Sequence, residues 1–366
     1  MKDCNPGCNY RISQDMSERI NIFRLIMTIL VIFNHSNSNL SLFSGEALTV
    51  SVSHWVSESK YIIAHFFGRA TVPGFFMVSA ILLYRKPFNW ASNMKRKLRS
   101  IAVPYFIINC GWILLFFIVQ LFPFSSSIFN NPDNIIANWD LRQWCNALLG
   151  APDKVVPFVY PLWFLRDLFI MNLLAGIIWK LVDKLPEPTF IAAIIAWLWF
   201  AQSNSSVPDF QSVCFWIFGT YIVKRNINPA KLDKIPTVLI AAILALCIYA
   251  EKLHRYDINY LVLYNLSITL SLLLVFRICT YIKCGKFKSA LLWLSGYSFS
   301  IYLFHEFTTL TFRKIVASLL PASNVSYFLQ FMLTPFIVAG FCLILSLLLQ
   351  KLFPRFYALL SGGRAK

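Results

Sequence analysis

Long apolar runs alternate with short polar segments along almost the whole chain of 366 residues. A helix needs about 20 mostly apolar residues to cross the hydrocarbon core of a bilayer, so each run of about that size predicts a membrane span. The pattern predicts ten transmembrane helices and therefore an all-α, polytopic membrane protein. The predicted spans are residues 19–36, 62–84, 101–122, 161–181, 189–203, 207–223, 235–250, 258–281, 290–311 and 328–353.

The composition agrees with this pattern. Hydrophobic residues make up 58% of the chain and charged residues 13%, and the mean hydropathy is +0.62. Soluble domains contain about 25% charged residues, and a soluble core of this composition would leave too little polar surface to cover itself. The composition therefore excludes a soluble enzyme, a disordered chain and a secreted disulfide scaffold.

The net charge of +17 reflects Lys and Arg residues that gather in alternate loops. If the N-terminus is cytoplasmic, 23 of the 33 Lys and Arg residues fall on the cytoplasmic side, 7 on the outer side and 3 inside spans. Cytoplasmic loops of membrane proteins carry such an excess. We therefore expect both termini in the cytoplasm. We expect no nucleic-acid partner, because the basic residues do not form one soluble face.

The same pattern divides the chain into three parts. Residues 1–18 are predicted to form a cytoplasmic N-terminal segment, residues 19–353 a ten-helix membrane domain, and residues 354–366 a basic cytoplasmic tail. The two longest connections, residues 37–61 and 123–160, are expected on the outer side of the membrane.

The first span carries two ionisable groups, Arg24 and His35. Eleven residues of α-helix place them within about 20° of one face and about 16 Å apart along the axis. Ionisable groups at membrane depth are costly and usually functional. The alternative interpretation is that Arg24 extends to the cytoplasmic interface and that His35 only ends the span.

The second span contains His65 and Arg69, which are neighbours on a helix because they are four residues apart. Pro73 and Gly74 follow and predict a kink or loosened turn at that point. Both ionisable groups lie toward the outer half of the span, so a pair of external interface residues is the alternative interpretation.

The loop after this span is strongly basic. It contains Lys95, Arg96 and Arg99, and the two arginines share a helical face because they are three residues apart. Guanidinium groups bind phosphates through two parallel hydrogen bonds. The segment therefore predicts a site for a phosphate-rich cytoplasmic cofactor, although a loop that only sets the topology would carry the same charge.

The ninth span carries a polar stripe. Ser298, Tyr302 and His305 lie at positions i, i+4 and i+7, and Glu306 follows directly. This spacing directs the stripe toward the interior of a helix bundle. Because three spans carry such groups, we expect a shared polar cavity.

The fourth span opens near Trp163 and continues to the adjacent residues Arg166 and Asp167. Neighbouring residues on a helix point about 100° apart. We therefore expect Arg166 and Asp167 to have separate partners.

The order of these motifs resembles the acyltransferase-3 family of integral-membrane O-acyltransferases, in the form without an extracytoplasmic esterase-like domain. The resemblance covers about residues 18 to 350. Ala80 departs from the family's usual Ser-Gly pattern, and its methyl group is expected to narrow a helix contact. The motifs are Arg24-x10-His35, Phe75-Phe76-Met77-Val78-Ser79-Ala80, Arg96-x-x-Arg99 before Pro104-Tyr105, Leu162-Trp163-Phe164-Leu165, and Gly296…Ser298…Tyr302-Leu303-x-His305.

This resemblance implies transfer of an acyl group, usually acetyl from acetyl-CoA, to a hydroxyl of a sugar or cell-envelope polysaccharide. It implies a bacterial inner membrane as the location and acyl-CoA, a glycan acceptor, the lipid bilayer and other envelope-polysaccharide synthesis proteins as partners. No metal is expected.

The family's motifs carry over onto Arg24 with His35 and onto Arg96 with Arg99. Transfer to a hydroxyl needs a base, and histidine titrates near neutral pH, so His35 is expected to be that base. His305 or Tyr302 would stabilise the intermediate or the acceptor. The expected site residues are His35, Arg24, His305 and Tyr302 for catalysis, Arg96, Arg99 and Lys95 for the acyl-CoA, and Trp163, Ser298, His65, Arg69 and Glu306 for the substrate.

Three alternatives remain open from the sequence. The chain could be a secondary transporter or glycan flippase that uses the same polar cavity. It could keep the fold and use a succinyl or other acyl donor, or an amine acceptor. It could also be a structural subunit of an envelope-synthesis complex. Whether an acyl group is carried on a His or Ser or transferred directly is likewise open.

Overall fold

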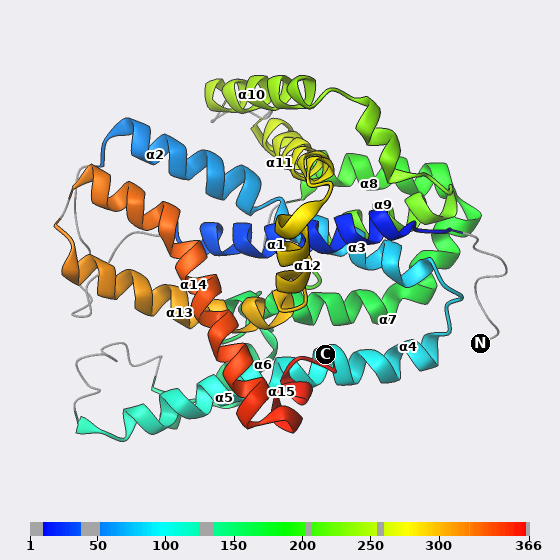
Figure 1. The fold of residues 1–366 in the computed structure, drawn as a ribbon. Helices are drawn as coiled ribbons and strands as arrows, with labels where there is room; N and C mark the ends of the chain where they lie inside the picture. The colour runs from blue at the N-terminus through cyan, green and yellow to red at the C-terminus, as the bar shows by residue number, and fades with distance from the viewer. Residues whose placement is uncertain are drawn as a thin grey trace. The chain divides into compact units, whose positions relative to one another are not determined.

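The computed structural model describes residues 10–37, 52–123, 135–201, 206–254, 260–321 and 323–363. Within these ranges all regular secondary structure is helical, which confirms the predicted all-α class (Figure 1). The chain divides into two compact units, and each is described by itself. Unit 1 comprises Met1–Val31, His65–Lys97 and Asp167–Ser298, and unit 2 comprises Ile32–Ala64, Leu98–Arg166 and Phe299–Lys366.

Most helices belong to one unit. Unit 1 holds most of α1 (Gln14–His35) and α7 (Trp163–Lys184), together with α3 (Thr71–Tyr84), α4 (Trp90–Lys97), α8 (Pro186–Phe200), α9 (Phe210–Lys224), η7 (Pro229–Lys234), α10 (Thr237–Leu253), α11 (Tyr260–Ile278), η8 (Cys279–Tyr281) and α12 (Gly285–Ser295). Unit 2 holds α2 (His54–Tyr61), η2 (Leu98–Ala102), α5 (Val103–Gln120), η5 (Ile136–Asn138), α6 (Leu141–Leu149), η6 (Tyr160–Leu162), nearly all of α13 (Ser298–Leu319), α14 (Asn324–Leu352) and α15 (Pro354–Leu360). The π-helix η1 (Ile62–Gly68) joins α2 to α3.

Within the described ranges, five helical segments are long and apolar enough to cross a membrane. They are His54–Tyr84, Trp90–Gln120, Tyr160–Lys184, Tyr260–Tyr281 and Asn324–Leu352, and Pro186–Phe200 is a shorter apolar helix. These five correspond to five of the predicted spans. The total of ten spans and the cytoplasmic position of both termini stay predictions.

The ninth predicted span, residues 290–311, is wrong as a single helix. The helix α12 ends at Ser295 and α13 begins at Ser298. At the break, the backbone N–H of Gly296 donates to the carbonyl of Trp293 at 3.1 Å and that of Tyr297 to Leu294 at 2.9 Å. These bonds span three residues and replace the four-residue bonds of an α-helix. The helix stops at Ser295-Gly296-Tyr297-Ser298, where the glycine disfavours a helix interior.

Close backbone contacts hold unit 1 together at two glycines. A Cβ on Gly74 would lie 2.7 Å from the Cδ1 atom of Leu272 and 3.1 Å from the Cζ atom of Phe23. A Cβ on Gly219 in α9 would lie 2.8 Å from the Cβ of Ala80 in α3. The expected close approach at Ala80 is therefore real, and the glycine on the facing helix makes room for the methyl group.

The predicted loosened turn lies ahead of Pro73 and not at it. The helix α3 begins at Thr71, so Pro73 falls in its first turn, where a missing backbone N–H breaks no helical bond. The irregular geometry is instead in the π-helix Ile62–Gly68.

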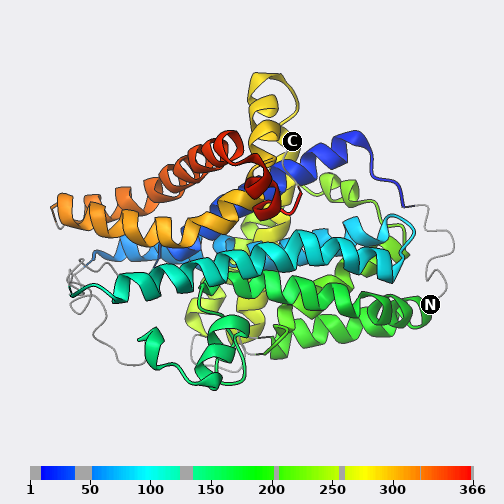
Figure 2. The same ribbon diagram turned by 90° about the horizontal axis from the view of Figure 1, so that it is seen from below.

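Unit 2 is braced by a buried asparagine. Asn109 on α5 is fully buried. Its Nδ2 group donates to the carbonyl of Ala147 at 2.9 Å, and its Oδ1 atom accepts the backbone N–H of Val159 at 3.0 Å. Asn109 thus fixes α6 and the segment that leads into η6. In the same unit, α14 crosses α13 at an oblique angle in Figure 1 and lies beside it in Figure 2.

Candidate active site

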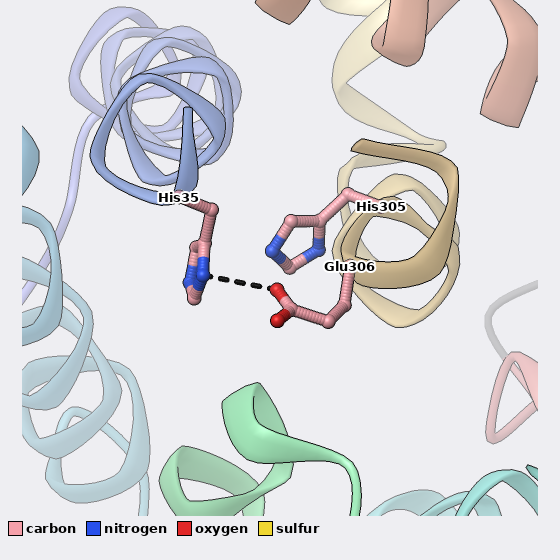
Figure 3. A group of neighbouring side chains, drawn as sticks. All are labelled: His35, His305 and Glu306. Carbon is pink, nitrogen blue, oxygen red and sulfur yellow. Dashed lines mark ion pairs between the residues drawn. The ribbon is translucent and has the colours of Figure 1, made fainter. Parts of the chain in front are cut away.

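The His35 imidazole lies at ion-pair distance from the Glu306 carboxylate in unit 2. The Nδ1 atom of His35, the last residue of α1, lies 2.9 Å from the Oε2 atom of Glu306 on α13. The two side chains are 14% and 15% exposed. Figure 3 shows the imidazole and the carboxylate pointing toward each other from the two helices. A carboxylate at one ring nitrogen orients an imidazole and favours the tautomer whose other nitrogen can accept a proton.

His305 completes the cluster and is fully buried. Its Nδ1 atom lies 2.6 Å from the backbone carbonyl of Tyr302. A carbonyl only accepts hydrogen bonds, so this contact requires the proton on Nδ1 and leaves a lone pair on Nε2. Among the described residues, nothing hydrogen-bonds to that Nε2 atom. The His305 ring lies 5.0 Å from the His35 ring, centroid to centroid, in an edge-on arrangement (Figure 3).

Two tyrosines surround the pair of imidazoles. The Tyr302 hydroxyl donates to the backbone carbonyl of Pro161, which ties α13 to η6. The Tyr160 ring, also in η6, lies 5.8 Å from the His35 ring. Tyr302 therefore supplies the carbonyl that fixes His305 and anchors the segment that carries Tyr160.

The structure brings together four predicted site residues, His35, Tyr302, His305 and Glu306. Trp163, at the start of α7, is also in unit 2 and is 6% exposed. The direct contact between His35 and Glu306 was not predicted. The signal for it was present, because a carboxylate in an apolar helix needs a partner, but the sequence does not say which helix supplies one.

Arg24 and Ser298 belong to unit 1. Arg24 is partly exposed, and its backbone carbonyl accepts the hydroxyl of Thr28 at 2.9 Å. Ser298 is 3% exposed, and its hydroxyl oxygen has no hydrogen-bond partner within the described ranges. Ser298 is the first residue of α13, the helix that also carries Tyr302 and His305.

His65 and Arg69 belong to unit 1. His65 is within η1 and Arg69 follows it. The charge of Arg69 acts on the hydroxyl of Tyr264 on α11, and the Phe66 ring packs 5.9 Å from that tyrosine. Both residues are half-buried.

The three predicted cofactor-binding residues are exposed. Lys95 and Arg96 are in the last turn of α4, and Arg99 is in the π-helix η2. The Arg96 guanidinium donates to the Asn93 amide oxygen at 3.0 Å. The predicted shared face assumes a continuous α-helix, and the change of helix type at Leu98 alters that spacing.

Arg166 and Asp167 have separate partners, as expected. The Arg166 guanidinium donates to the carbonyl of Leu149 at 2.8 Å, at the end of α6. The Asp167 carboxylate accepts the backbone N–H of Asp209 at 2.6 Å, at the start of α9.

Unit 1 contains a polar cavity that the sequence did not predict. It has a volume of about 600 Å³, and its charged lining residues are Asp15, Arg19, Asp233, Arg277, Lys283 and Lys288. Arg19 contacts Asp233 at 3.0 Å and donates to the carbonyl of Phe276 at 2.8 Å. Lys288 lies 2.8 Å from Glu18, and its hydrogen bond lowers the pKa of that carboxyl. The cavity combines residues far apart in sequence, so no local motif marks it.

His35, His305 and Glu306 also have the donor atoms of a metal site. One ligand atom from each lies within 4.8 Å of the others. Two imidazoles and a carboxylate are ligands that several divalent metals accept. In this arrangement the carboxylate is occupied by the His35 imidazole at ion-pair distance.

Comparison with known proteins decides the family. A family model described as an acyltransferase domain matches residues 17–350, which include the whole histidine cluster. The chain belongs to the acyltransferase-3 family. It is therefore an acyltransferase, and the resemblance seen in the sequence is confirmed.

One relative aligns with nearly the whole of this acyltransferase. The succinoglycan biosynthesis protein ExoH of Rhizobium meliloti (strain 1021) is 24% identical over 361 residues, which cover 96% of this chain and 93% of ExoH. No solved structure matches the chain.

Proposed function

We propose that this acyltransferase is a multi-pass protein of the bacterial inner membrane that transfers an acetyl group from acetyl-CoA to a hydroxyl of a cell-envelope polysaccharide. The family supports acyl transfer, and the helices that are long and apolar enough to cross a bilayer support the membrane location. The name of the relative ExoH refers to the biosynthesis of a glycan, which supports a sugar hydroxyl as the acceptor.

The observation that carries this proposal is the His35–Glu306 pair beside the buried Nε2 atom of His305. In the proposed scheme Glu306, at 2.9 Å from Nδ1 of His35, keeps the imidazole proton on Nδ1, so the Nε2 atom of His35 accepts the proton of the acceptor hydroxyl. The hydroxyl oxygen then bonds to the thioester carbon, and the bond from carbon to sulfur breaks. The proton on His35 passes to the leaving thiolate, which restores the neutral imidazole.

His305 and Tyr302 have positioning and binding roles in this scheme. With its proton on Nδ1, His305 offers a lone pair and no donor, so it can accept a hydrogen bond from the acceptor hydroxyl and cannot donate one to an oxyanion. This favours the role of acceptor stabiliser over that of intermediate stabiliser. The same lone pair could instead carry the acyl group, so the covalent route stays an alternative.

The cations proposed to hold the CoA phosphates are Lys95, Arg96 and Arg99. Their exposure leaves them accessible to a cytoplasmic cofactor, and guanidinium groups suit phosphate oxygens. Arg24 is proposed to assist them from α1. We also propose that the reaction needs no metal, because an ion at the cluster would compete with His35 for the carboxylate. A chelator should then leave the rate unchanged.

The test is acyl transfer by the purified, detergent-solubilised protein, measured as CoA release in the presence of candidate glycans. We expect His35→Ala to lower the rate by about 10²- to 10⁴-fold, the usual contribution of a general base. The matched control is His54→Ala, which removes an exposed histidine of the same unit and should leave the rate unchanged.

Equal rates in wild type and His35→Ala would remove His35 from the chemistry. A wild-type protein that moves a glycan across vesicles but never turns over a thioester would favour the transporter or flippase alternative. Turnover of succinyl-CoA with none of acetyl-CoA would keep the reaction and replace the donor.

A further inference from the structure

Two cavities adjoin each other in unit 1, and one is polar and the other apolar. The polar cavity, of about 600 Å³, is described above, and the apolar cavity has a volume of about 350 Å³. Met16 and Asn228 line both, so the cavities share a wall. Apart from Tyr10, Asn228 and Lys231, all side chains that line the apolar cavity are wholly apolar. Both volumes fall in the range of about 300–1,000 Å³ that ligand sites occupy.

The cavities follow each other along one membrane helix. Leu272 and Phe276 of α11 line the apolar cavity, and Arg277 and the turn Cys279–Tyr281 line the polar one. The helix is part of Tyr260–Tyr281, which is long and apolar enough to cross a bilayer. The polar cavity therefore lies at the end of a span, and the apolar cavity lies nearer its middle. A phospholipid has the same order, with its head group at the membrane surface and its chains deeper.

This end of the span is predicted to face the cytoplasm. The loop that follows it carries Lys283, Lys286 and Lys288, and an excess of Lys and Arg is typical of cytoplasmic loops. Basic pockets between membrane helices on this side bind the anionic head groups of lipids. The position and the charge of the polar cavity therefore suit a lipid phosphate.

Three cations of the polar cavity are held by the fold itself. Arg19 contacts Asp233 as described above, and Lys288 lies 2.8 Å from Glu18. The Arg277 guanidinium donates to two backbone carbonyls at 3.1 Å and 3.2 Å. These contacts fix the walls of the cavity and leave it basic, since four Lys and Arg residues line it against two Asp residues. The additional carboxylate of Glu18 does not cancel this excess.

Two lysines are not used in this way. Lys283 lines the polar cavity and Lys231 the apolar one, and both are exposed. Among the described residues, neither side chain has a hydrogen bond or ion pair. Each ammonium group therefore keeps its donors for an acceptor outside the protein. Each cavity thus has a cation that the described part of the fold does not use.

We propose that the two cavities bind one anionic phospholipid of the cytoplasmic leaflet, with its phosphate in the polar cavity and part of an acyl chain in the apolar cavity. Lys283 and Lys231 attract the phosphate, and burial of the chain against apolar side chains adds affinity. A small phosphate compound would fill the polar cavity alone, so the adjoining apolar cavity favours a lipid. This inference rests on the membrane location in the proposed function and uses none of the acyl-transfer chemistry.

Lipid binding to the intact, detergent-purified protein tests this proposal, and native mass spectrometry measures it. The probes are dioleoylphosphatidylglycerol, whose head group is anionic, and dioleoylphosphatidylcholine, whose head group has no net charge. We expect the anionic lipid to bind about 10-fold more tightly, because two lysines attract its charge. Equal affinities for the two lipids would overturn the proposal.

Lysine variants show whether this preference comes from the two cavities. Lys231→Gln and Lys283→Gln should each lower the affinity for phosphatidylglycerol about 3- to 5-fold and leave that for phosphatidylcholine almost unchanged. The matched control is Lys286→Gln, which removes an exposed lysine that lines neither cavity. It should change the affinity by less than about 2-fold. An equal loss in all three variants would indicate general attraction to a basic surface and would contradict the site.

A further pair of variants tests the acyl chain. Ile235 lines the apolar cavity and is 40% exposed. Ile235→Trp should therefore block the cavity, keep the fold, and lower the affinity for both lipids about 5-fold or more. Leu239→Trp, at an exposed position outside both cavities, should leave the affinity unchanged. If Ile235→Trp does not fold, Leu232→Phe repeats the test with a smaller change. Full lipid affinity in the folded variant would remove the chain from the apolar cavity and overturn the proposal.

Competition separates this site from that of the acyl donor. Acetyl-CoA also carries phosphates, but its proposed phosphate site is on α4 and η2, so it should not displace bound phosphatidylglycerol. Displacement would assign the polar cavity to the donor, and the lipid site would be wrong. Binding is measured without turnover, which keeps this inference separate from the proposed function. A protein that binds the lipid and transfers no acyl group keeps the lipid site and loses the acyl-transfer proposal, and the reverse result does the opposite.

Discussion

Unit 1 and unit 2 each bury an ion pair, and the two pairs are satisfied to different degrees. In unit 1, Arg19 contacts Asp233 at 3.0 Å, donates twice to the carbonyl of Phe276, and stacks 3.9 Å over the centroid of the Phe276 ring. In unit 2, His35 contacts Glu306 at 2.9 Å beside His305. The Nε2 atom of His305 is buried without a hydrogen-bond partner in the described part of the chain.

This difference separates a structural pair from a reactive one. The Arg19 guanidinium is held by fixed acceptors through three hydrogen bonds, so its loss should cost stability. The buried lone pair of an imidazole that accepts no hydrogen bond within the fold can still accept one from a substrate. Burying such an atom without a partner costs free energy. Such a cost is retained where the group is needed for binding or chemistry. The following variants test this distinction, from the largest expected effect to the smallest.

Glu306→Gln should have the largest effect, and this effect should be on the rate of acyl transfer. The amide cannot hold the Nδ1 proton of His35 as a carboxylate does, so we expect kcat to fall by about 10²-fold, or about 2.7 kcal/mol in the barrier. The shape is nearly unchanged, so the melting temperature should move by less than about 2 °C. Glu187→Gln, at an exposed glutamate of unit 1, is the matched control. Full activity in Glu306→Gln would contradict the assigned role.

Arg19→Gln should have the opposite effect, lowering the stability of the protein and leaving its activity almost unchanged. It removes the contacts to Asp233 and the Phe276 carbonyl, and we expect a loss of about 2–3 kcal/mol in the free energy of unfolding. This loss of unfolding free energy is smaller than the loss expected for a fully buried ion pair, because the Asp233 side chain is 35% exposed. Activity per folded molecule should stay within about 2-fold. Thermal unfolding in detergent measures the first quantity and CoA release the second, with the exposed Lys286→Gln as control.

An Arg19 variant that unfolds normally but loses turnover would place the unit 1 cavity in the reaction. That result would end the distinction between the two pairs, because a pair held by fixed acceptors would then be functional.

Sequence analysis predicted features that depend on local composition and missed contacts between distant helices. Hydropathy predicted the helices that are long and apolar, because membrane insertion is a property of local composition. It failed at Gly296 and Tyr297, where three-residue backbone bonds end a helix at a short Ser-Gly-Tyr-Ser stretch between two apolar runs. It identified His35, His305 and Glu306 as separate costly groups. Their pairing is a tertiary contact between α1 and α13, which no spacing in one sequence determines.

Asn109→Ala should have an intermediate effect, because Asn109 supports the site from a distance. The change leaves the carbonyl of Ala147 and the N–H of Val159 without their buried partner, which should cost about 1–3 kcal/mol of stability. Val159 precedes Tyr160, whose ring packs against His35, so turnover should fall several-fold through displacement of η6. Asn138→Ala, at an exposed position, should change neither. A destabilised variant with full turnover would show that η6 does not position the cluster.

The smallest effect is expected at an exposed pair of unit 2, Arg142 and Asp153. The hydrogen bond from Arg142, followed by that from Asn146, holds the pKa of Asp153 below its usual value. A carboxyl whose folded pKa is lowered contributes stability that is present above its unfolded pKa, about 3.9, and is lost as the pH falls through the folded pKa. Asp153→Asn should therefore lower the melting temperature slightly at pH 7 and not at all near pH 2. Both side chains are well exposed, so water screens the pair.

A cycle of Arg142→Gln, Asp153→Asn and the double variant measures this pair directly. At pH 7 both single variants should lower the melting temperature, Asp153→Asn somewhat more because Asn146 also donates to that carboxylate, and the double variant should add little to Asp153→Asn. At low pH all four proteins should melt together, apart from general acid destabilisation. If the cycle instead gave an effect as large as that of Arg19→Gln, exposure would not be what weakens an ion pair in this protein, and the ranking of the three pairs by their satisfied contacts and burial would fail.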